Sequence, residues 1–188
     1  MRRVILDYEA GAWGRGTLVV EDRRLVHHEL PRRSEPTAAS APTPNDPQGI
    51  PEIPAQSVSS AGGSECAESV PILLARRLSH RLSSYFEGED DPFDDVELDL
   101  EWCTPFQRAV VDALRAVPRG EVVTYGELAA LAGHPGAQRA AGSFCARNPF
   151  PILVPCHRVV AADGLGSYGS LGVGYKRRLL ELEGAVLG

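Results

Sequence analysis

Residues 148–158 read Asn-Pro-Phe-Pro-Ile-Leu-Val-Pro-Cys-His-Arg, and this stretch carries more information than any other part of the chain. Its apolar run lies between two prolines and predicts a buried strand or strand-like segment. The run is followed by Cys156, His157 and Arg158, where the chain is expected to leave the core. Because a thiolate rather than a thiol attacks electrophiles, an imidazole and a cation beside the sulfur favour a nucleophilic cysteine. For the Cys-His pair alone, a buried structural cysteine beside an incidental histidine remains the simpler interpretation.

Length and composition set broad bounds on the protein. The chain has 188 residues, which suits one domain or two small ones, and 43% of them are hydrophobic, enough to build a core. No apolar run is long enough for a membrane-spanning helix, and Asp7 comes too early for a secretory signal. The four cysteines lie far apart, so neither a disulfide framework nor a cysteine-rich zinc site is expected. These features predict a reduced, cytoplasmic protein.

The net charge of −6 conceals a division of the chain into an acidic and a basic part. Residues 1–103 contain 10 Lys and Arg against 19 Asp and Glu, whereas residues 104–188 contain 9 against 6. Much of the acid lies in residues 87–101, which we interpret as a solvated connector. The C-terminal part is the candidate nucleic-acid surface, although charge alone would not point to DNA.

The first part of the chain is expected to contain a small antiparallel sheet and one helix. Short β-rich runs occupy residues 2–8, 16–21 and 24–29, and turn signals lie at residues 14–16 and 21–24. Residues 31–69 are rich in Pro, Ser, Ala, Thr and Gly, which predicts a disordered linker. Apolar residues at helical spacing then predict a helix over residues 70–86. No chemistry is evident in this part.

The second part contains clear signals for helix starts. Thr104-Pro105-Phe106-Gln107 combines an N-cap, a proline at the first helical position and a capping-box glutamine. Residues 124–127 form a second capping box, and a further helix is expected within residues 136–147. Two short helices around a glycine-containing turn have the proportions of a helix-turn-helix motif.

The second of these helices is unusually rich in small residues. Ala137, Ala140, Ala141, Gly142 and Ser143 surround Arg139. Small side chains let a helix lie close to a narrow groove, and an arginine among them can fill the space of an extruded base. The alternative is that the small residues serve tight helix packing and that the arginine is a surface charge.

Several of these motifs together resemble one family, the O6-alkylguanine-DNA alkyltransferases, which move an alkyl group from a damaged base onto their own cysteine. The matching residues are 104–107, 123–129, 139, 148–160 and 176–184. The resemblance is dense over about residues 100–188 and looser over the N-terminal part. It implies an α+β protein in two domains. Residues 1–99 would form a small sheet-and-helix domain that includes the linker, and residues 100–188 an all-helical, helix-turn-helix (winged-helix-like) DNA-binding catalytic domain.

The resemblance also assigns roles position by position. Cys156 would accept the alkyl group, and His157 would draw the thiol proton away through a bound water. Glu183 would hold the imidazole, and Asn148 would brace the active-site turn. The residues expected to contact DNA are Tyr125, Arg139, Ala137, Ala140, Arg147 and Arg158. The expected substrate pocket consists of Tyr125, Pro151, Val159, Tyr168 and Ser170.

The implied activity is direct, irreversible transfer from O6-alkylguanine in double-stranded DNA, and whether O4-alkylthymine is a second substrate stays open. The protein would bind the minor groove as a monomer and flip the base out, because the O6 substituent cannot be reached inside the stacked duplex. No cofactor and no membrane are implied.

Two features of the chain depart from the family pattern. In the loop at 166–176, Tyr168 falls one place early and Leu171 occupies a usual glycine position. Because this loop closes the base pocket in the family, the accepted alkyl size stays open. Some members hold a structural zinc in the N-terminal domain. Here the candidate ligands of that region are His27, His28, His80 and Cys66, and we expect no metal site.

Two other classes of protein compete with this interpretation. A non-enzymatic DNA-lesion binding protein of similar fold would lack the acceptor cysteine, whereas Cys156 is present. A plain helix-turn-helix regulator would carry base-reading side chains, whereas residues 137–143 are nearly featureless.

Overall fold

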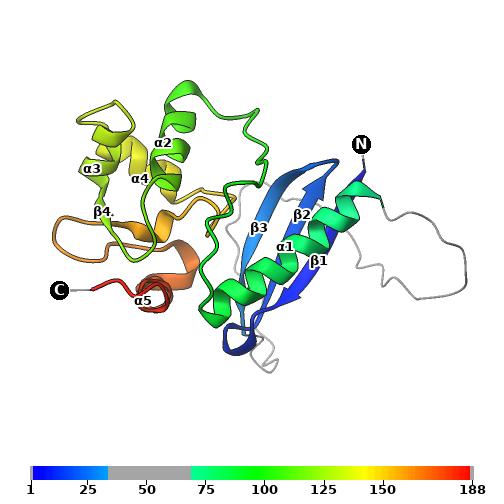
Figure 1. Cartoon of the computed structure of the whole chain (residues 1–188). Coiled ribbons are helices and arrows are strands. Elements are labelled where there is room, and N and C mark those ends of the chain that lie inside the picture. Colours follow the sequence, from blue (N-terminus) through cyan, green and yellow to red (C-terminus); the bar gives the residue numbers. More distant parts are fainter. Residues whose placement is uncertain (1, 34–68, 187–188) are drawn as a thin grey trace, which may run out of the picture.

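The computed structural model describes residues 2–33 and 69–186. The elements are β1 (Arg3–Glu9), β2 (Arg15–Glu21), β3 (Arg24–Arg32), α1 (Val70–Glu87), α2 (Pro105–Arg115), β4 (Val123–Thr124), α3 (Tyr125–Leu131), α4 (Gln138–Cys145), β5 (Val159–Val160) and α5 (Gly172–Leu182). Short 3-10 helices occupy Gly11–Trp13, Cys156–Arg158 and Gly169–Leu171. In Figure 1, α1 lies along the three-stranded sheet, and α2 to α5 gather on the other side of the molecule.

The N-terminal sheet is antiparallel with the order β1-β2-β3, as expected from the sequence. Of the two predicted turns, the second is confirmed as a hairpin around Asp22, which has a positive φ of 50°. The first lies earlier than predicted, at the 3-10 helix Gly11–Trp13. Gly16 belongs to β2, opposite Tyr8, and a Cβ there would lie 2.5 Å from the tyrosine ring. That glycine therefore serves close packing within the sheet rather than a turn.

Strand β3 extends further than the sequence suggests. The predicted linker, residues 31–69, begins too early, because Pro31 and Arg32 are part of β3, and Arg32 pairs with Arg15 of β2. Pro31 is buried, and its carbonyl accepts a hydrogen bond of 2.9 Å from the Tyr175 hydroxyl. Tertiary contacts thus extend the strand into a segment whose composition indicated a linker. The rest of that prediction, over residues 34–68, lies outside the described residues.

Helix α1 confirms the predicted helix. Its buried face includes Leu78, Leu82, Tyr85 and Phe86, whose spacing follows the helical period. The helix ends at Gly88, whose left-handed φ of 106° suits a residue without a side chain. The C-terminal end of α1 contacts the C-terminal half of the molecule, where the Tyr85 hydroxyl donates to Glu183.

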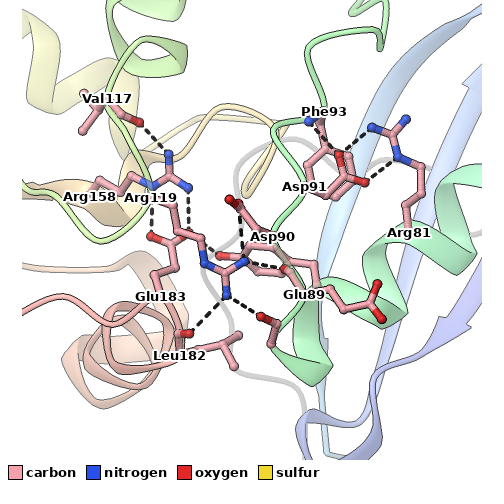
Figure 2. A network of polar contacts seen from close by, with 12 residues as sticks. Arg81, Glu89, Asp90, Asp91, Phe93, Val117, Arg119, Arg158, Leu182 and Glu183 are labelled. Carbon is pink, nitrogen blue, oxygen red and sulfur yellow. Dashed lines mark hydrogen bonds and ion pairs between the residues drawn. The ribbon is translucent and has the colours of Figure 1, made fainter.

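The acidic segment at residues 87–101 is packed against the protein, so its interpretation as a solvated connector is only partly right: most of its carboxylates are exposed, but its apolar side chains are not. Phe93 and Val96 are buried in the hydrophobic core. Asp91 accepts two hydrogen bonds of 2.6 Å from Arg81 of α1, an arrangement visible in Figure 2. The segment is packed because its apolar side chains enter the core and its carboxylates pair with arginines of both halves, Arg81 of α1 on one side and Arg115 and Arg119 on the other.

The helices of the C-terminal part begin where the capping signals place them. Thr104 and Gln107 form a reciprocal capping box at α2, and Thr124 and Glu127 form another at α3. However, this part is not all-helical as expected, because β4 and β5 form a two-stranded parallel sheet. The pairing ties the start of α3 to the residues that follow Cys156.

One hydrophobic core spans both parts of the chain. It includes Tyr85 and Phe93 from the N-terminal half together with Phe150 and Leu179 from the C-terminal half. The two halves are therefore packed as one body. Within residues 2–33 and 69–186, none of the helices has the length and apolarity needed to cross a membrane.

Candidate active site

The chain between α4 and Cys156 is a buried turn held by one amide side chain. Asn148 accepts a hydrogen bond from the Phe150 amide at 3.0 Å and donates to the Val154 carbonyl at 2.7 Å. The same Nδ2 lies 3.2 Å from Sγ of Cys156. The prediction of a strand here is wrong, since Ile152 has a left-handed φ of 72° and its neighbours form a turn. A β-branched residue in that region costs free energy that the surrounding packing must offset.

Cys156 lies at the N-terminus of a 3-10 helix and is only 7% exposed. Burial raises the pKa of its thiol, and three neighbours oppose that effect, namely Asn148, the hydroxyl of Tyr168 and the ammonium group of Lys176. Burial also lowers the pKa of Lys176. The thiol is therefore held protonated at rest, next to groups that favour the thiolate. Such a cysteine needs a base to become a nucleophile.

The next residue along the chain supplies an imidazole with a carboxylate partner. Nε2 of His157 lies 3.0 Å from Oε1 of Glu183, and neither side chain is exposed. Burial lowers the pKa of His157, and Glu183 opposes that effect. Burial also disfavours ionisation of Glu183, yet His157 and Arg158 outweigh it and hold the pKa of that carboxyl well below its usual range. The pair is consequently a neutral imidazole beside a carboxylate.

Arg158 does not have the position predicted for a DNA contact. Its guanidinium donates to both oxygens of Glu183, at 2.9 and 2.7 Å, and to the Val117 carbonyl at 2.6 Å (Figure 2). The side chain is only 12% exposed. These bonds occupy the guanidinium inside the protein, so we assign Arg158 to Glu183 rather than to a phosphate. The fork geometry of arginine suits such a two-oxygen contact.

A cavity of about 300 Å³ lies beside Cys156. Six of the residues proposed from the sequence line it: Tyr125, Asn148, Pro151, Cys156, Tyr168 and Ser170. Val159 does not, since its side chain is fully buried and its carbonyl accepts a hydrogen bond of 2.6 Å from Lys176. Val159 therefore supports the site from behind, contrary to its predicted place in the substrate pocket.

The remaining proposed DNA contacts lie on or next to α4. Arg139, Ala140 and Arg147 are exposed, and Ala137 is half-buried. The inner face of α4 buries Ala141 and Phe144, so the outer face is left for a partner. None of these four residues lines the cavity, but Gly142 and Cys145 of the same helix do, so the helix that carries the proposed contacts borders it.

Strand β3 forms a wall of the cavity that sequence reasoning missed. His28, Leu30 and Arg32 line it. His28 contacts the Tyr8 hydroxyl and the Pro151 carbonyl, each at 2.7 Å, which ties the sheet to the active-site turn. Arg32 donates to Ser170 Oγ at 3.0 Å. No local pattern predicts the contacts of His28 with Pro151 and of Arg32 with Ser170, because these partners are more than 100 residues apart in the sequence.

Lys176 was also missed, although it belongs to a motif that carries the family resemblance. Its ammonium group is fully buried and donates to the carbonyls of Val159 and Leu165.

No metal site is found in the part of the chain that the structure describes, because no three His, Cys, Asp or Glu side chains there form a cluster able to hold an ion. Cys66 lies outside that part.

Comparison with known proteins agrees with this geometry. Residues 105–185 match the family model described as 6-O-methylguanine DNA methyltransferase, DNA binding domain. A methylated-DNA–protein-cysteine methyltransferase of Methanothermobacter thermautotrophicus is 41% identical over 120 residues, which cover 64% of this chain and 67% of the relative. The protein of that name from Mycobacterium bovis is 52% identical over 104 residues, covering 55% and 61%.

A solved structure extends the likeness over nearly the whole chain. The crystal structure of Mycobacterium tuberculosis OGT in complex with DNA superposes with a TM-score of 0.66 and 34% sequence identity. The superposition covers 96% of this chain and 92% of that one. The family model, the relatives and the shared fold all lead to one assignment: the chain belongs to the methylated-DNA–protein-cysteine methyltransferase family.

Proposed function

We propose that this protein repairs DNA by moving the alkyl group of O6-alkylguanine, and of O4-alkylthymine, directly and irreversibly onto its own Cys156. The observation that carries the proposal is the place of Cys156 in the wall of the cavity. The amide of Asn148 lies 3.2 Å from the sulfur of Cys156, and the next residue, His157, is buried beside Glu183. Double-stranded DNA is the proposed partner, supported by the DNA complex of the M. tuberculosis relative. The protein would act as a monomer.

The first step activates the thiol. Both ring nitrogens of His157 are buried, and among the described residues neither makes a hydrogen bond of good geometry, although Nε2 lies 3.0 Å from Oε1 of Glu183 and Nδ1 has no protein partner. We assign Nδ1 to a bound water that passes the thiol proton from Cys156 to the imidazole. Glu183, on Nε2, keeps the ring in the tautomer that accepts at Nδ1 and stabilises the imidazolium that forms.

The second step is an in-line displacement at the alkyl carbon. A bond forms between Sγ of Cys156 and that carbon, while the carbon–O6 bond breaks and its electron pair moves onto the base. Tyr125 donates a proton to the base, and burial raises the pKa of this hydroxyl, which keeps it protonated. The imidazolium then returns a proton to Tyr125. Neutral guanine and a thioether remain, and because a thiolate is a poor leaving group from an alkyl thioether, the alkyl group stays on the sulfur.

The exposed face of α4 supplies the proposed DNA contacts. Its small residues let the helix enter the minor groove, and Arg139 fills the stack that the flipped base has left. Arg147 is exposed two residues after this helix and would contact a phosphate. Extrusion costs a few kcal/mol, and less for an alkylated guanine because it pairs poorly.

The test is the intact mass of the protein after incubation with a duplex that contains O6-methylguanine. We expect one added methyl group on the peptide that contains Cys156. Cys156→Ser should abolish the gain while binding of the duplex remains. Cys145 lines the same cavity, so Cys145→Ser is the matched control and should still gain one methyl group. A methyl group on Cys156→Ser would show that the nucleophile is another residue.

A further inference from the structure

A hydroxyl from the N-terminal half reaches the centre of the active-site network. Tyr85 of α1 is only 1% exposed, and its hydroxyl donates to Oε1 of Glu183 at 2.6 Å. The same oxygen lies 3.0 Å from Nε2 of His157 and 2.7 Å from Nη2 of Arg158. Tyr85, the imidazole and the guanidinium thus share one carboxylate oxygen.

The position of Tyr85 is fixed from several sides. The guanidinium of Arg119 lies over its ring, 5.4 Å from the centroid. Arg119 also donates to the Gly88 carbonyl at the end of α1, at 2.9 Å, and to the Leu182 carbonyl next to Glu183, at 3.2 Å. The ring of Tyr85 packs edge-on against Phe93. The hydroxyl therefore has little freedom to leave Glu183.

A donor on a carboxylate oxygen disperses the negative charge that this oxygen presents to other partners. The more charge Oε1 presents to Nε2, the more the protonated form of His157 is favoured. Burial and the hydrogen bond raise the pKa of Tyr85 well above its usual range, so its hydroxyl stays a donor at every pH of interest.

We propose that Tyr85 is a positioning residue for the transfer reaction, whose hydroxyl holds Oε1 of Glu183 and limits the charge offered to His157. Together with burial, this keeps the imidazole neutral, and so able to accept the thiol proton, at neutral pH. The inference rests on the proposed function, in which His157 is the proton acceptor. It gives the N-terminal half a part in the chemistry.

Other charged or titratable groups face the same pair. They are Arg158 from the 3-10 helix, Lys176 from α5, Arg119 from the segment after α2, and Tyr168, which interacts with Tyr85 and Cys156. The cations Arg158 and Lys176 disfavour a charged His157. All of them remain when the Tyr85 hydroxyl is removed, so its effect is separable from theirs.

The experiment compares the full-length protein with Tyr85→Phe, which deletes one oxygen. The rate of reaction with free O6-benzylguanine is measured across the pH range in which imidazoles titrate, and the His157 ring is followed by NMR. We expect the acid limb of the rate profile, and the His157 titration, to move up by about half a pH unit or more in Tyr85→Phe. Rates should fall several-fold on the acid side and converge with wild type at high pH.

Tyr175→Phe is the matched control, because its hydroxyl donates to the Pro31 carbonyl instead. Its pH profile should equal that of wild type. Replacing the tyrosines by 3-fluorotyrosine gives a stronger donor at Tyr85 and should move the acid limb down, and Tyr85→Phe in the same background should cancel that movement.

An unchanged acid limb in Tyr85→Phe, or one that moves down, would overturn the proposal, whatever the melting temperature does. A uniform loss of rate at all pH values would show a purely structural role and would also overturn it. A wild-type protein that gains no benzyl group would instead contradict the proposed function. In that case the NMR titration of His157 still measures whether Tyr85 acts on the imidazole.

Discussion

At the scale of single residues, the site depends on how one buried carboxylate is neutralised. Glu183 receives the Tyr85 hydroxyl, the His157 ring and two hydrogen bonds from Arg158. A buried ion pair is costly to desolvate and becomes favourable only when most of its hydrogen bonds are made, as they are here. Removing one partner leaves the other charge uncompensated. The network is therefore sensitive to small chemical changes at its centre.

Glu183→Gln is expected to destabilise the protein in a pH-dependent way. The pKa of Glu183 is lower in the folded than in the unfolded state, so its contribution is complete above the unfolded value of about 4.3 and declines as the pH falls below it. At neutral pH, leaving Arg158 without its carboxylate should cost about 3–5 kcal/mol of unfolding free energy. Urea denaturation at neutral and acidic pH measures both.

The control for this prediction is Glu181→Gln, an exposed residue on the same helix. It should change the unfolding free energy by less than about 0.5 kcal/mol. The difference between wild type and Glu183→Gln should shrink in acid. A difference that stays constant down to low pH would mean that the ionised carboxylate is not what stabilises the fold.

At the scale of elements, the sequence predicts helices well because their ends are encoded locally. Thr104 with Gln107, and Thr124 with Glu127, start α2 and α3 as expected. The turn before Cys156 was predicted as a strand because an apolar run between two prolines is typical of a buried strand. Instead the chain turns there, with Ile152 in a left-handed conformation, Asn148 bonding the backbone of the turn and His28 of β3 contacting the Pro151 carbonyl. In this turn, packing and side-chain hydrogen bonds outweigh the local preference of the sequence for a strand.

The candidate site divides in the same way. Cys156, His157 and Asn148 could be proposed from one continuous motif, and the structure brings them together with Glu183. The pairing of Arg158, and the contributions of β3, could not. They depend on contacts between segments that are far apart in the sequence. The residue type alone does not distinguish an arginine that binds a phosphate from one that pairs with a buried carboxylate.

Arg139→Ala tests the proposed role of α4. We expect repair of a duplex to slow by about tenfold or more, since the arginine offsets part of the few kcal/mol that base extrusion costs. Reaction with free O6-benzylguanine needs no extrusion and should be unchanged. Transfer rates on the two substrates, measured with the same protein preparation, provide the comparison.

Arg147→Ala is the control, because this exposed residue is proposed to contact a phosphate. It should weaken binding to damaged and undamaged duplexes alike and lower the salt dependence of binding by about one counterion. Equal losses for Arg139→Ala on duplex and free base would leave Arg139 as a folding or surface residue.

At the scale of the whole molecule, the two halves are joined by polar contacts as well as by their common core. Arg119 lies where the end of α1, the segment after α2 and the end of α5 meet, as Figure 2 shows. Its guanidinium donates to the carbonyls of Gly88, Glu89 and Leu182. Helix carbonyls at C-terminal ends lack partners within the helix, and a cation there satisfies them. One side chain thus satisfies carbonyl groups at the C-terminal ends of both α1 and α5 and links the two helices.

Arg119→Ala should therefore destabilise the packing of the two halves against each other rather than a single helix or strand. The side chain is only 16% exposed, and losing its charged hydrogen bonds should lower the unfolding free energy by about 2–4 kcal/mol. Arg119→Lys should recover part of the lost stability, because a single ammonium group cannot reach carbonyls on both helices.

Arg77→Ala is the control. Arg77 forms an ion pair with Asp95, the two side chains are 68% and 51% exposed, and losing the pair should cost about 0–1 kcal/mol. Denaturant titrations compare all three. If Arg119→Ala cost no more than Arg77→Ala, the halves would be held together by the apolar core alone, and the carbonyl contacts of Arg119 would be incidental to the fold.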